Sequence, residues 1–274
     1  MKRIRFIFSL MVLLIAIPTV PVSAGSVSNN TLNSNILIRL NQFYVVFTSP
    51  IAPYMDKNNR IMVPLRSLSN LLSADVTYNP ESKTAVISRK NLLNATEKFY
   101  TIKMAVSEKR VEINGVRSEM DTTPTLYKGS MFVPLCIITT AFHINTEWDQ
   151  INSIMKLNVD PAYLPSEVVS DELHFLSDKM NEDLRPIKSS AITNTNPYGT
   201  HLTNVRLTAV NEGTSAVLSN KLYFLFYIKE DSHFHQVEVV NPSLIQPGGT
   251  LTLETGDAIL SDSLQYVLVG VYNY

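Results

Sequence analysis

The stretch "RIMVPLRSLSNLL", Arg60–Leu72, recurs seventy positions later as "SMFVPLCIITTAF", Ser130–Phe142. In both copies a valine precedes a proline, an order that pushes the valine into extended backbone and presets the proline for the first turn of a helix. The apolar residues that follow have helical spacing and fall on one stripe. The first copy contributes Val63, Pro64, Leu65, Leu68 and Leu72, and the second contributes Val133, Pro134, Leu135, Ile138 and Phe142. A helix of about two turns is marginal alone in water, so we expect both helices to be held against a sheet.

Turn residues end the strand that precedes each copy. The strand before the second copy ends at Asn114 and Gly115, which predict a tight hairpin because both residues tolerate positive φ. The strand before the first copy ends at Asn41, and because Gln42 follows it, we expect a less tight turn there.

After each helix the chain repeats a strand–turn–strand pattern, over residues 74–87 and 144–157. Tyr78 and Trp148 stand at equivalent positions of this pattern, seventy residues apart. The stretch "FYTIKMAV" between the copies alternates and predicts an extra strand. The sequence therefore predicts an α+β domain over residues 36–160, in which two related halves form a mostly antiparallel sheet with two short helices.

From Pro161 onward the pattern changes. Apolar residues at helical spacing predict a connecting helix that begins near Ser166 and stops before Pro186, and a polar, turn-rich stretch after it predicts a linker. We place this connecting helix and linker at residues 161–195. Short strands separated by turns then predict an all-β unit over residues 196–274, a small β-sandwich of immunoglobulin-like form.

Residues 1–24 are typical of a secretory signal peptide, because basic residues precede a short apolar run and Ala24 ends a small-residue cleavage site. We expect cleavage there, followed by a disordered segment over residues 25–35. The mature protein would be secreted and could associate with the cell wall. It would contact a membrane only through an uncleaved signal peptide. Without the leader, 20 basic and 24 acidic residues give a net charge of −4, which argues against nucleic acid as a partner.

The repeated motifs carry a family resemblance. Residues 36–158 resemble the copper amine oxidase N-terminal-like domain, also called the stalk domain, of secreted and cell-surface proteins of Gram-positive bacteria. The resemblance rests on the order Leu-Asn, Val-Pro-Leu-Arg, Ala-Asp-Val, Asn-Gly, Val-Pro-Leu and Trp-Asp. The resemblance implies two related halves and a domain that lies far from the catalytic site. In the oxidases, copper and the quinone belong to a much larger catalytic domain, which has no counterpart in these 274 residues.

The sequence departs from the family pattern at a few positions. Cys136 stands where the second half of the family usually has Arg, and Ser73 and His143 stand where Gly often closes the helix. The stretch "YKGS" replaces the usual Gly-Arg turn before the second motif. Gly adopts positive φ at a helix end without steric strain, so its replacement at these positions implies the same topology with altered helix caps.

No catalytic motif in the sequence is as specific as the repeated Val-Pro-Leu motif. Gly-x-Ser-x-Gly, His-Glu-x-x-His, a P-loop and a Gly-rich dinucleotide turn are all absent from the sequence. Copper would require about three converging imidazoles, and only His233 and His235 are close in sequence, where we interpret them as surface residues. We therefore expect no enzyme activity, no cofactor and no metal. A metal-dependent enzyme stays an alternative, as do paired glycosidase carboxylates, whose geometry is tertiary.

Some aromatic residues could form a binding face. Phe43, Tyr44, Tyr54 and Tyr127 lie in or beside expected turns, and glycan-binding faces often use such rings. Core packing or ordinary surface is the better interpretation for most of them, because Phe43 and Tyr44 are also good strand residues.

Two polar residues of the motifs have simple structural interpretations. We expect Arg66 to pair with a neighbouring acid or backbone carbonyl, and Cys136 to be a small buried apolar residue.

The sequence thus favours a non-catalytic, secreted or cell-envelope-associated bacterial protein that acts as a structural spacer or interaction module. The alternative is a binding module for cell-wall glycan or another envelope protein. Ligand-binding residues are not assigned by the sequence.

Overall fold

The computed structural model describes residues 32–34, 36–47, 52–92, 99–166, 168–169, 183–218, 221–228, 233–240, 244–256, 258–259 and 264–271. The expected signal peptide and most of the expected connecting helix lie outside these ranges. Strands dominate the described part, which has two short α-helices and several antiparallel sheets, as is compatible with the α+β class.

The two copies of the repeated motif meet at the centre of a four-stranded sheet, in the order β11-β12-β5-β4. β5 and β12 pair antiparallel with Val63 directly opposite Val133. An approximate twofold axis therefore relates the two halves at this valine pair. The strands are β4 (Tyr54–Met55), β5 (Ile61–Pro64), β11 (Thr125–Tyr127) and β12 (Ser130–Pro134).

Each motif strand runs directly into a helix, α1 (Leu65–Leu71) or α2 (Leu135–Ala141). The expectation that proline occupies the first helical turn is wrong by one residue. Pro64 and Pro134 have ψ of 114° and 124°, so they are extended N-cap residues and each helix begins at the following leucine. The proline φ suits both roles, and the pairing of β5 with β12 selects the extended one.

The residue that follows the C-cap of each helix has left-handed backbone. Ser73 has φ of 51° and His143 has φ of 53°, in the position where helices commonly end on glycine. These are the two positions at which the sequence departs from the family's glycine. The departure leaves the helix ends in place and puts residues with a Cβ into a conformation that favours glycine.

The two halves exchange their hairpins. One five-stranded sheet, in the order β10-β9-β8-β7-β6, joins the last hairpin of the first half to the first hairpin of the second half through β8. The last hairpin of the second half joins the first hairpin of the first half directly, because β14 pairs parallel with β2. The expectation of one mostly antiparallel sheet is therefore wrong, because the strands divide among three sheets. The strands of the first sheet are β6 (Ala74–Asn79), β7 (Thr84–Lys90), β8 (Phe99–Ala105), β9 (Arg110–Ile113) and β10 (Val116–Glu119).

The first hairpins of both halves have the same loop length. Leu40 lies opposite Phe43, so a two-residue turn joins β2 and β3, as Asn114 and Gly115 join β9 and β10. The expected looser turn at Asn41 is wrong. Asn41 itself takes positive φ of 49°, and its side chain exchanges two hydrogen bonds with the backbone of Val159, which hold the tight turn.

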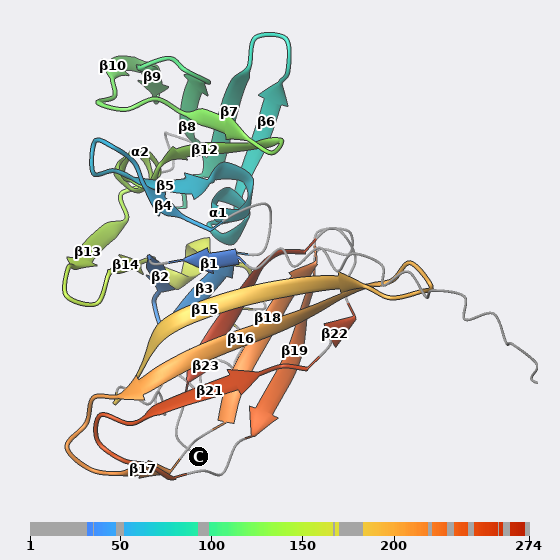
Figure 1. Cartoon of the computed structure of the whole chain (residues 1–274). Helices are drawn as coiled ribbons and strands as arrows, with labels where there is room; N and C mark the ends of the chain where they lie inside the picture. Colours follow the sequence, from blue (N-terminus) through green and yellow to red (C-terminus); the bar gives the residue numbers. More distant parts are fainter. Residues whose placement is uncertain are drawn as a thin grey trace, which may run out of the picture.

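A seven-stranded sheet runs through both predicted domains, in the order β13-β14-β2-β3-β23-β18-β19. β3, near the N-terminus, pairs antiparallel with β23, near the C-terminus, with Val46 opposite Val267 (Figure 1). The boundary expected at residues 161–195 therefore does not separate two sheets. The strands are β2 (Leu37–Leu40), β3 (Phe43–Phe47), β13 (Asn145–Asp149), β14 (Ile154–Asn158), β18 (Lys221–Ile228), β19 (His233–Val240) and β23 (Leu264–Val271).

A second sheet packs on the C-terminal part of this one, in the order β1-β15-β16-β21, with β22 also on β16. In Figure 1, β15, β16 and β21 lie in front of β18, β19 and β23. The linker expected before residue 196 is in fact part of β15, and residues 32–34 of the expected disordered segment form β1 on its edge. The remaining elements are β1 (Leu32–Ser34), β15 (Leu184–Thr195), β16 (His201–Asn211), β17 (Val217–Leu218), β20 (Leu244–Ile245), β21 (Thr250–Glu254), β22 (Ala258–Ile259) and the 3-10 helix η1 (Pro161–Tyr163).

Alternation along β3 and β23 divides the core into two layers. Phe43, Val45 and Phe47 belong to the core of the N-terminal domain, whereas Tyr44 and Val46 face the second sheet. β23 alternates in the same way, with Leu268 in the first layer and Val267 in the second. Both strands are thus buried on both faces, which makes them the structural junction of the molecule.

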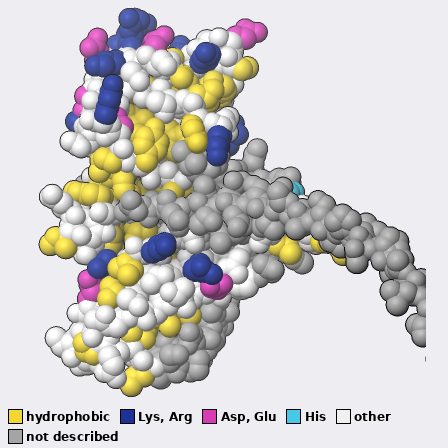
Figure 2. All heavy atoms as spheres, in the orientation of Figure 1, with side chains coloured by type: hydrophobic (Ala, Val, Ile, Leu, Met, Phe, Trp, Pro, Cys, Tyr) yellow, Lys and Arg dark blue, Asp and Glu magenta, His cyan; other side chains and the backbone are white. Residues whose placement is uncertain are grey.

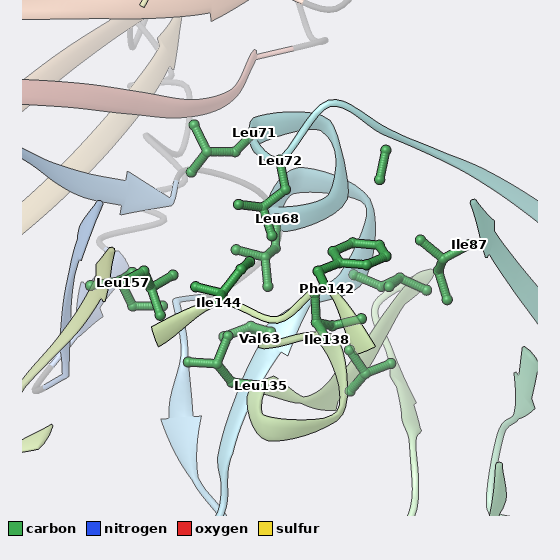
Figure 3. Close-up of a cluster of buried hydrophobic side chains, with 14 of the residues drawn as sticks. Val63, Leu68, Leu71, Leu72, Ile87, Leu135, Ile138, Phe142, Ile144 and Leu157 are labelled. Carbon is green, nitrogen blue, oxygen red and sulfur yellow. The ribbon is translucent and has the colours of Figure 1, made fainter. Parts of the chain in front are cut away.

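The helices fill the first layer. Leu65, Leu68, Leu135 and Ile138, which the stripe pattern assigns to the core, are at most 3% exposed. Figure 3 shows the side chains of α1 and α2 converging with Val63, between strands of different sheets. The helices contact strands β5 and β12, and α1 also contacts β6 while α2 contacts β8. Two-turn helices are therefore stabilised by tertiary burial and not by their own propensity.

Candidate functional site

Two clefts in the N-terminal domain occupy equivalent positions in the two halves. The first cleft has a volume of about 170 Å³ and lies between α1 with β6 and the β11–β12 hairpin. The second cleft has a volume of about 160 Å³ and lies between α2 with β13 and the β4–β5 hairpin. Equivalent lining residues, seventy positions apart, are Leu65 and Leu135, Arg66 and Cys136, Tyr78 and Trp148, Gly129 and Asn59, Ser130 and Arg60, and Met131 and Ile61. Each cleft is therefore built by both halves, and each contains one aromatic side chain from the same strand position.

An exposed cation lies in the first cleft. Arg66 follows Leu65 in the first turn of α1, and because Leu65 is directed into the core, Arg66 points outward. Within the described part of the chain, its guanidinium makes no hydrogen bond or ion pair, so the expected pairing with an acid or carbonyl is not found among these residues. Tyr78 on β6 is partly buried and forms part of the cleft wall. The first cleft thus combines an aromatic ring with a positive charge that no described residue neutralises.

In the second cleft the positive charge is neutralised. Arg60 forms an ion pair with Asp121, and both side chains are about half exposed. Trp148, the single tryptophan of the chain, is 36% exposed.

Cys136, the single cysteine, is also exposed at the second cleft, so the expectation of a buried apolar residue is wrong. It occupies the outward position of α2 that Arg66 has on α1. Desolvation raises the pKa of its thiol, against the smaller opposing effect of Arg60, so the thiol form is favoured.

A polar network fixes the β4–β5 hairpin beside the second cleft. The Asp56 carboxylate accepts hydrogen bonds from the backbone amides of Asn58 and Arg60, both at 2.8 Å, and from the Thr122 hydroxyl. Partial desolvation would raise the pKa of Asp56, but these hydrogen bonds outweigh it and hold the pKa below its ordinary value of 3.8. Because Asn58 also donates to the backbone of Asp121, the network ties the first half to the second.

A buried cation elsewhere serves packing. Arg89 on β7 is 2% exposed, and its Nη2 donates to the backbone oxygen of Phe142 at 2.7 Å. Its Cζ lies 4.1 Å from the ring centroids of both Phe142 and Tyr163. Desolvation lowers its pKa. Among the described residues, its Nε and Nη1 have no hydrogen-bond partner. The aromatic faces, with Tyr100 as a third ring at 5.6 Å, therefore stabilise the buried charge together with the hydrogen bond to Phe142.

The other motif residues expected from the sequence have structural positions. Val63, Val133, Pro64 and Pro134 are buried at the centre of the four-stranded sheet and make the strand-to-helix transitions. Asn114 and Gly115 lie away from the clefts, in the turn between β9 and β10, at φ of 49° and 79°. The Asn114 side chain accepts a hydrogen bond from the amide of Thr101 at 2.8 Å, which ties the turn to β8.

The four aromatic residues proposed as a glycan-binding face do not lie together on the surface. Phe43 and Tyr44 are buried on opposite faces of β3. Tyr54 packs on Phe132 with a centroid distance of 5.6 Å. Tyr127 is 47% exposed. The aromatic residues that do line clefts, Tyr78 and Trp148, were identified from the sequence only as markers of the repeat.

The histidines are spread along the chain. His143 contacts the ring of Tyr100 edge-on, at 5.5 Å between centroids, and His201 lies on β16. His174 lies outside the described residues, and His233 and His235 lie on β19, where the backbone alone is described. In the described part of the chain, no group of three or more His, Cys, Asp and Glu residues is arranged to hold a metal ion.

Comparison with known proteins finds a family match over the domain that contains the clefts. A family model described as the copper amine oxidase N-terminal domain matches residues 40–157, which include both repeated motifs. A comparison with curated proteins found no match. Among the helices that the structure describes, none has the length and apolar composition required to cross a membrane.

Proposed function

Because residues 40–157 form a copper amine oxidase N-terminal domain, we propose that this protein is a secreted, cell-envelope-associated protein of a Gram-positive bacterium, which acts as a structural spacer and interaction module. The family is one of non-catalytic domains, and the proposal extends that property to the whole chain. The signal peptide interpreted from residues 1–24 supports export.

The observation that carries the proposal is the pairing of β3 with β23. It makes the family domain and the C-terminal strands share one sheet, with five buried residues in β3. Because β3 and β23 are paired and both are buried on both faces, we expect the two parts to move as one body. Within the proposal, the C-terminal strands form a β-sandwich of immunoglobulin-like form that the family domain completes along one edge.

Export and the lack of metal chemistry can be tested together. The full chain is expressed with its leader in a Gram-positive host, and the medium, wall and cytoplasmic fractions are compared. We expect the chain in the medium or wall fraction with a new N-terminus at residue 25. We also expect copper and zinc contents of less than about a tenth of an equivalent per chain by elemental analysis. Retention in the cytoplasm would oppose export, and a stoichiometric metal would oppose the non-catalytic assignment.

A second candidate function is recognition of cell-wall glycan, and the clefts are the observation that favours it. Each has an aromatic side chain from the same strand position and lies open at the surface, as sugar-binding sites on proteins commonly do. Sedimentation with purified peptidoglycan tests this function. The protein should appear in the pellet, and protein that stays entirely in the supernatant would leave the spacer role alone.

A further inference from the structure

We propose that the first cleft binds a carboxylate-bearing amino sugar of the wall glycan, a muramic acid residue whose lactyl carboxylate carries no stem peptide, with the carboxylate on Arg66 and the sugar ring on Tyr78. The proposal rests on the second candidate function, glycan recognition, and adds the site and the ligand chemistry. It concerns the first cleft only.

The guanidinium of Arg66, which has no partner among the described residues, favours an anionic ligand. No acidic residue lines the first cleft, and Arg66 makes no ion pair within the described part of the chain. In the second cleft, by contrast, Arg60 is already paired with Asp121. A planar guanidinium matches a carboxylate through two parallel hydrogen bonds. The first cleft can therefore offer the positive charge of Arg66 to a ligand, whereas the positive charge in the second cleft is already paired within the protein.

The walls of the cleft suit a sugar ring. Tyr78 presents an aromatic face, on which the apolar C–H groups of a pyranose can pack. Ser130 lies on the opposite wall, in the β11–β12 hairpin, and supplies a hydroxyl. Its neighbour Gly129 has φ of 79°, and a Cβ built there would meet nothing within 4 Å. The cleft is therefore open at this turn, so that one ring can be bound while the polymer continues outward.

Charge distribution along the chain directs an anionic ligand to this domain. Residues 36–160 contain 14 basic and 11 acidic residues, a net charge of +3, whereas residues 161–274 contain 6 basic and 13 acidic residues, a net charge of −7. Figure 2 shows Lys and Arg side chains distributed over the N-terminal domain, around an exposed strip of hydrophobic side chains. Long-range attraction raises the local concentration of an anionic polymer at the positive domain.

Two matched sugars test the assignment. N-acetylmuramic acid and N-acetylglucosamine differ by a lactyl ether that carries a carboxylate. The mature chain, residues 25–274, is titrated with each sugar, and binding is followed by NMR shifts of backbone amides. The acidic sugar should shift the amides of Arg66, Tyr78 and Gly129 and should bind about tenfold or more tightly than the neutral sugar, the effect of one charged hydrogen-bonded pair.

Variants separate the roles of charge and ring. Arg66→Gln should remove the preference for the acidic sugar, whereas Lys103→Gln, which removes the same charge from an exposed site on β8 that does not line the cleft, should retain it. Tyr78→Leu should weaken binding of both sugars. The thermal midpoint of each variant is measured first, so that a loss of binding is not confused with a loss of fold.

The outcomes distinguish this assignment from the function on which it rests. If the protein sediments with peptidoglycan but both sugars bind equally, or if Arg66→Gln changes nothing, glycan recognition stands and this site is wrong. Shifts confined to residues around Trp148 would place binding in the second cleft and would also overturn the proposal. If neither sugar binds and the protein does not sediment, both the site and the function are refuted.

Discussion

Ser73→Gly should stabilise the protein, because Ser73 has left-handed backbone at the end of α1. Its φ is 51°, and its amide closes the helix by donating to the backbone oxygen of Asn70 at 3.0 Å. A residue with a Cβ loses roughly 1–2 kcal/mol in this conformation. Glycine avoids that loss, but its greater freedom in the unfolded chain removes about 0.5–1 kcal/mol of the gain. The expected net stabilisation is about 0.5–1 kcal/mol, or roughly 1–4 °C in thermal midpoint for a chain of this size.

Urea denaturation followed by the fluorescence of Trp148 measures this change. The matched control is Ser82→Gly, since Ser82 is also exposed in a turn but its φ is not in the left-handed region. There glycine adds only freedom to the unfolded chain, so the control should be neutral or destabilised by up to about 1 kcal/mol. His143→Gly, at the equivalent end of α2, should gain less than Ser73→Gly because it also loses the ring contact with Tyr100. If Ser73→Gly and Ser82→Gly are equally destabilised, the strain assigned to the helix end does not exist.

Three further predictions concern charge, stacking and the junction. Despite partial desolvation, hydrogen bonds depress the pKa of Asp56 below 3.8, so its stabilisation is present above that pH and is lost as the pH falls through the lower, folded-state pKa. Asp56→Asn should therefore flatten the acid limb of the unfolding free energy measured between pH 5 and pH 2, and an unchanged limb would contradict this. Arg89→Lys keeps the charge but loses the planar stacking, and should be less stable by about 1–3 kcal/mol in urea denaturation, whereas wild-type stability would refute a role for stacking. Tyr266→Phe removes the 2.8 Å hydrogen bond from β23 to Asn70 on α1 and should cost about 1 kcal/mol; a thermal midpoint equal to that of the wild type would show that this contact contributes nothing.

The local structure of the repeat was predictable because its determinants are local. A valine before a proline, followed by leucines at helical spacing, predicts a strand that turns into a buried helix whatever surrounds it. The seventy-residue offset also relates Tyr78 to Trp148, and these positions became the walls of the two clefts. What the offset could not show is that the opposite wall of each cleft comes from the other half, because that depends on the pairing of β5 with β12.

Long-range pairing is where prediction from the sequence fails. The run Phe43–Phe47 is apolar without alternation, a pattern typical of a strand buried on both faces, but nothing in it identifies Leu264–Val271 as its partner. The opposite error occurred at Ser189–Thr195, where Ser, Thr and Asn predicted a linker. These residues lie in β15 and pair along their whole length with β16, because strand formation depends on the neighbouring strand more than on local composition. The pairing expected for Arg66 depends on long-range structure in the same way, since which described residues lie within reach of its guanidinium is a property of the tertiary structure.

The continuity of the sheet from β3 into β23 is tested most directly by residue-resolved hydrogen exchange on the mature chain. β10 is a built-in reference, because it is the equivalent of β3 in the second half and is the end strand of its sheet in the described part of the chain. Its four residues are all exposed, whereas all five residues of β3 are buried. If β23 covers the edge of β3, amides on both sides of β3 should be protected, while alternate amides of β10 exchange rapidly. Rapid exchange at alternate amides of β3, matching β10, would contradict the shared sheet and with it the proposal of a rigid spacer.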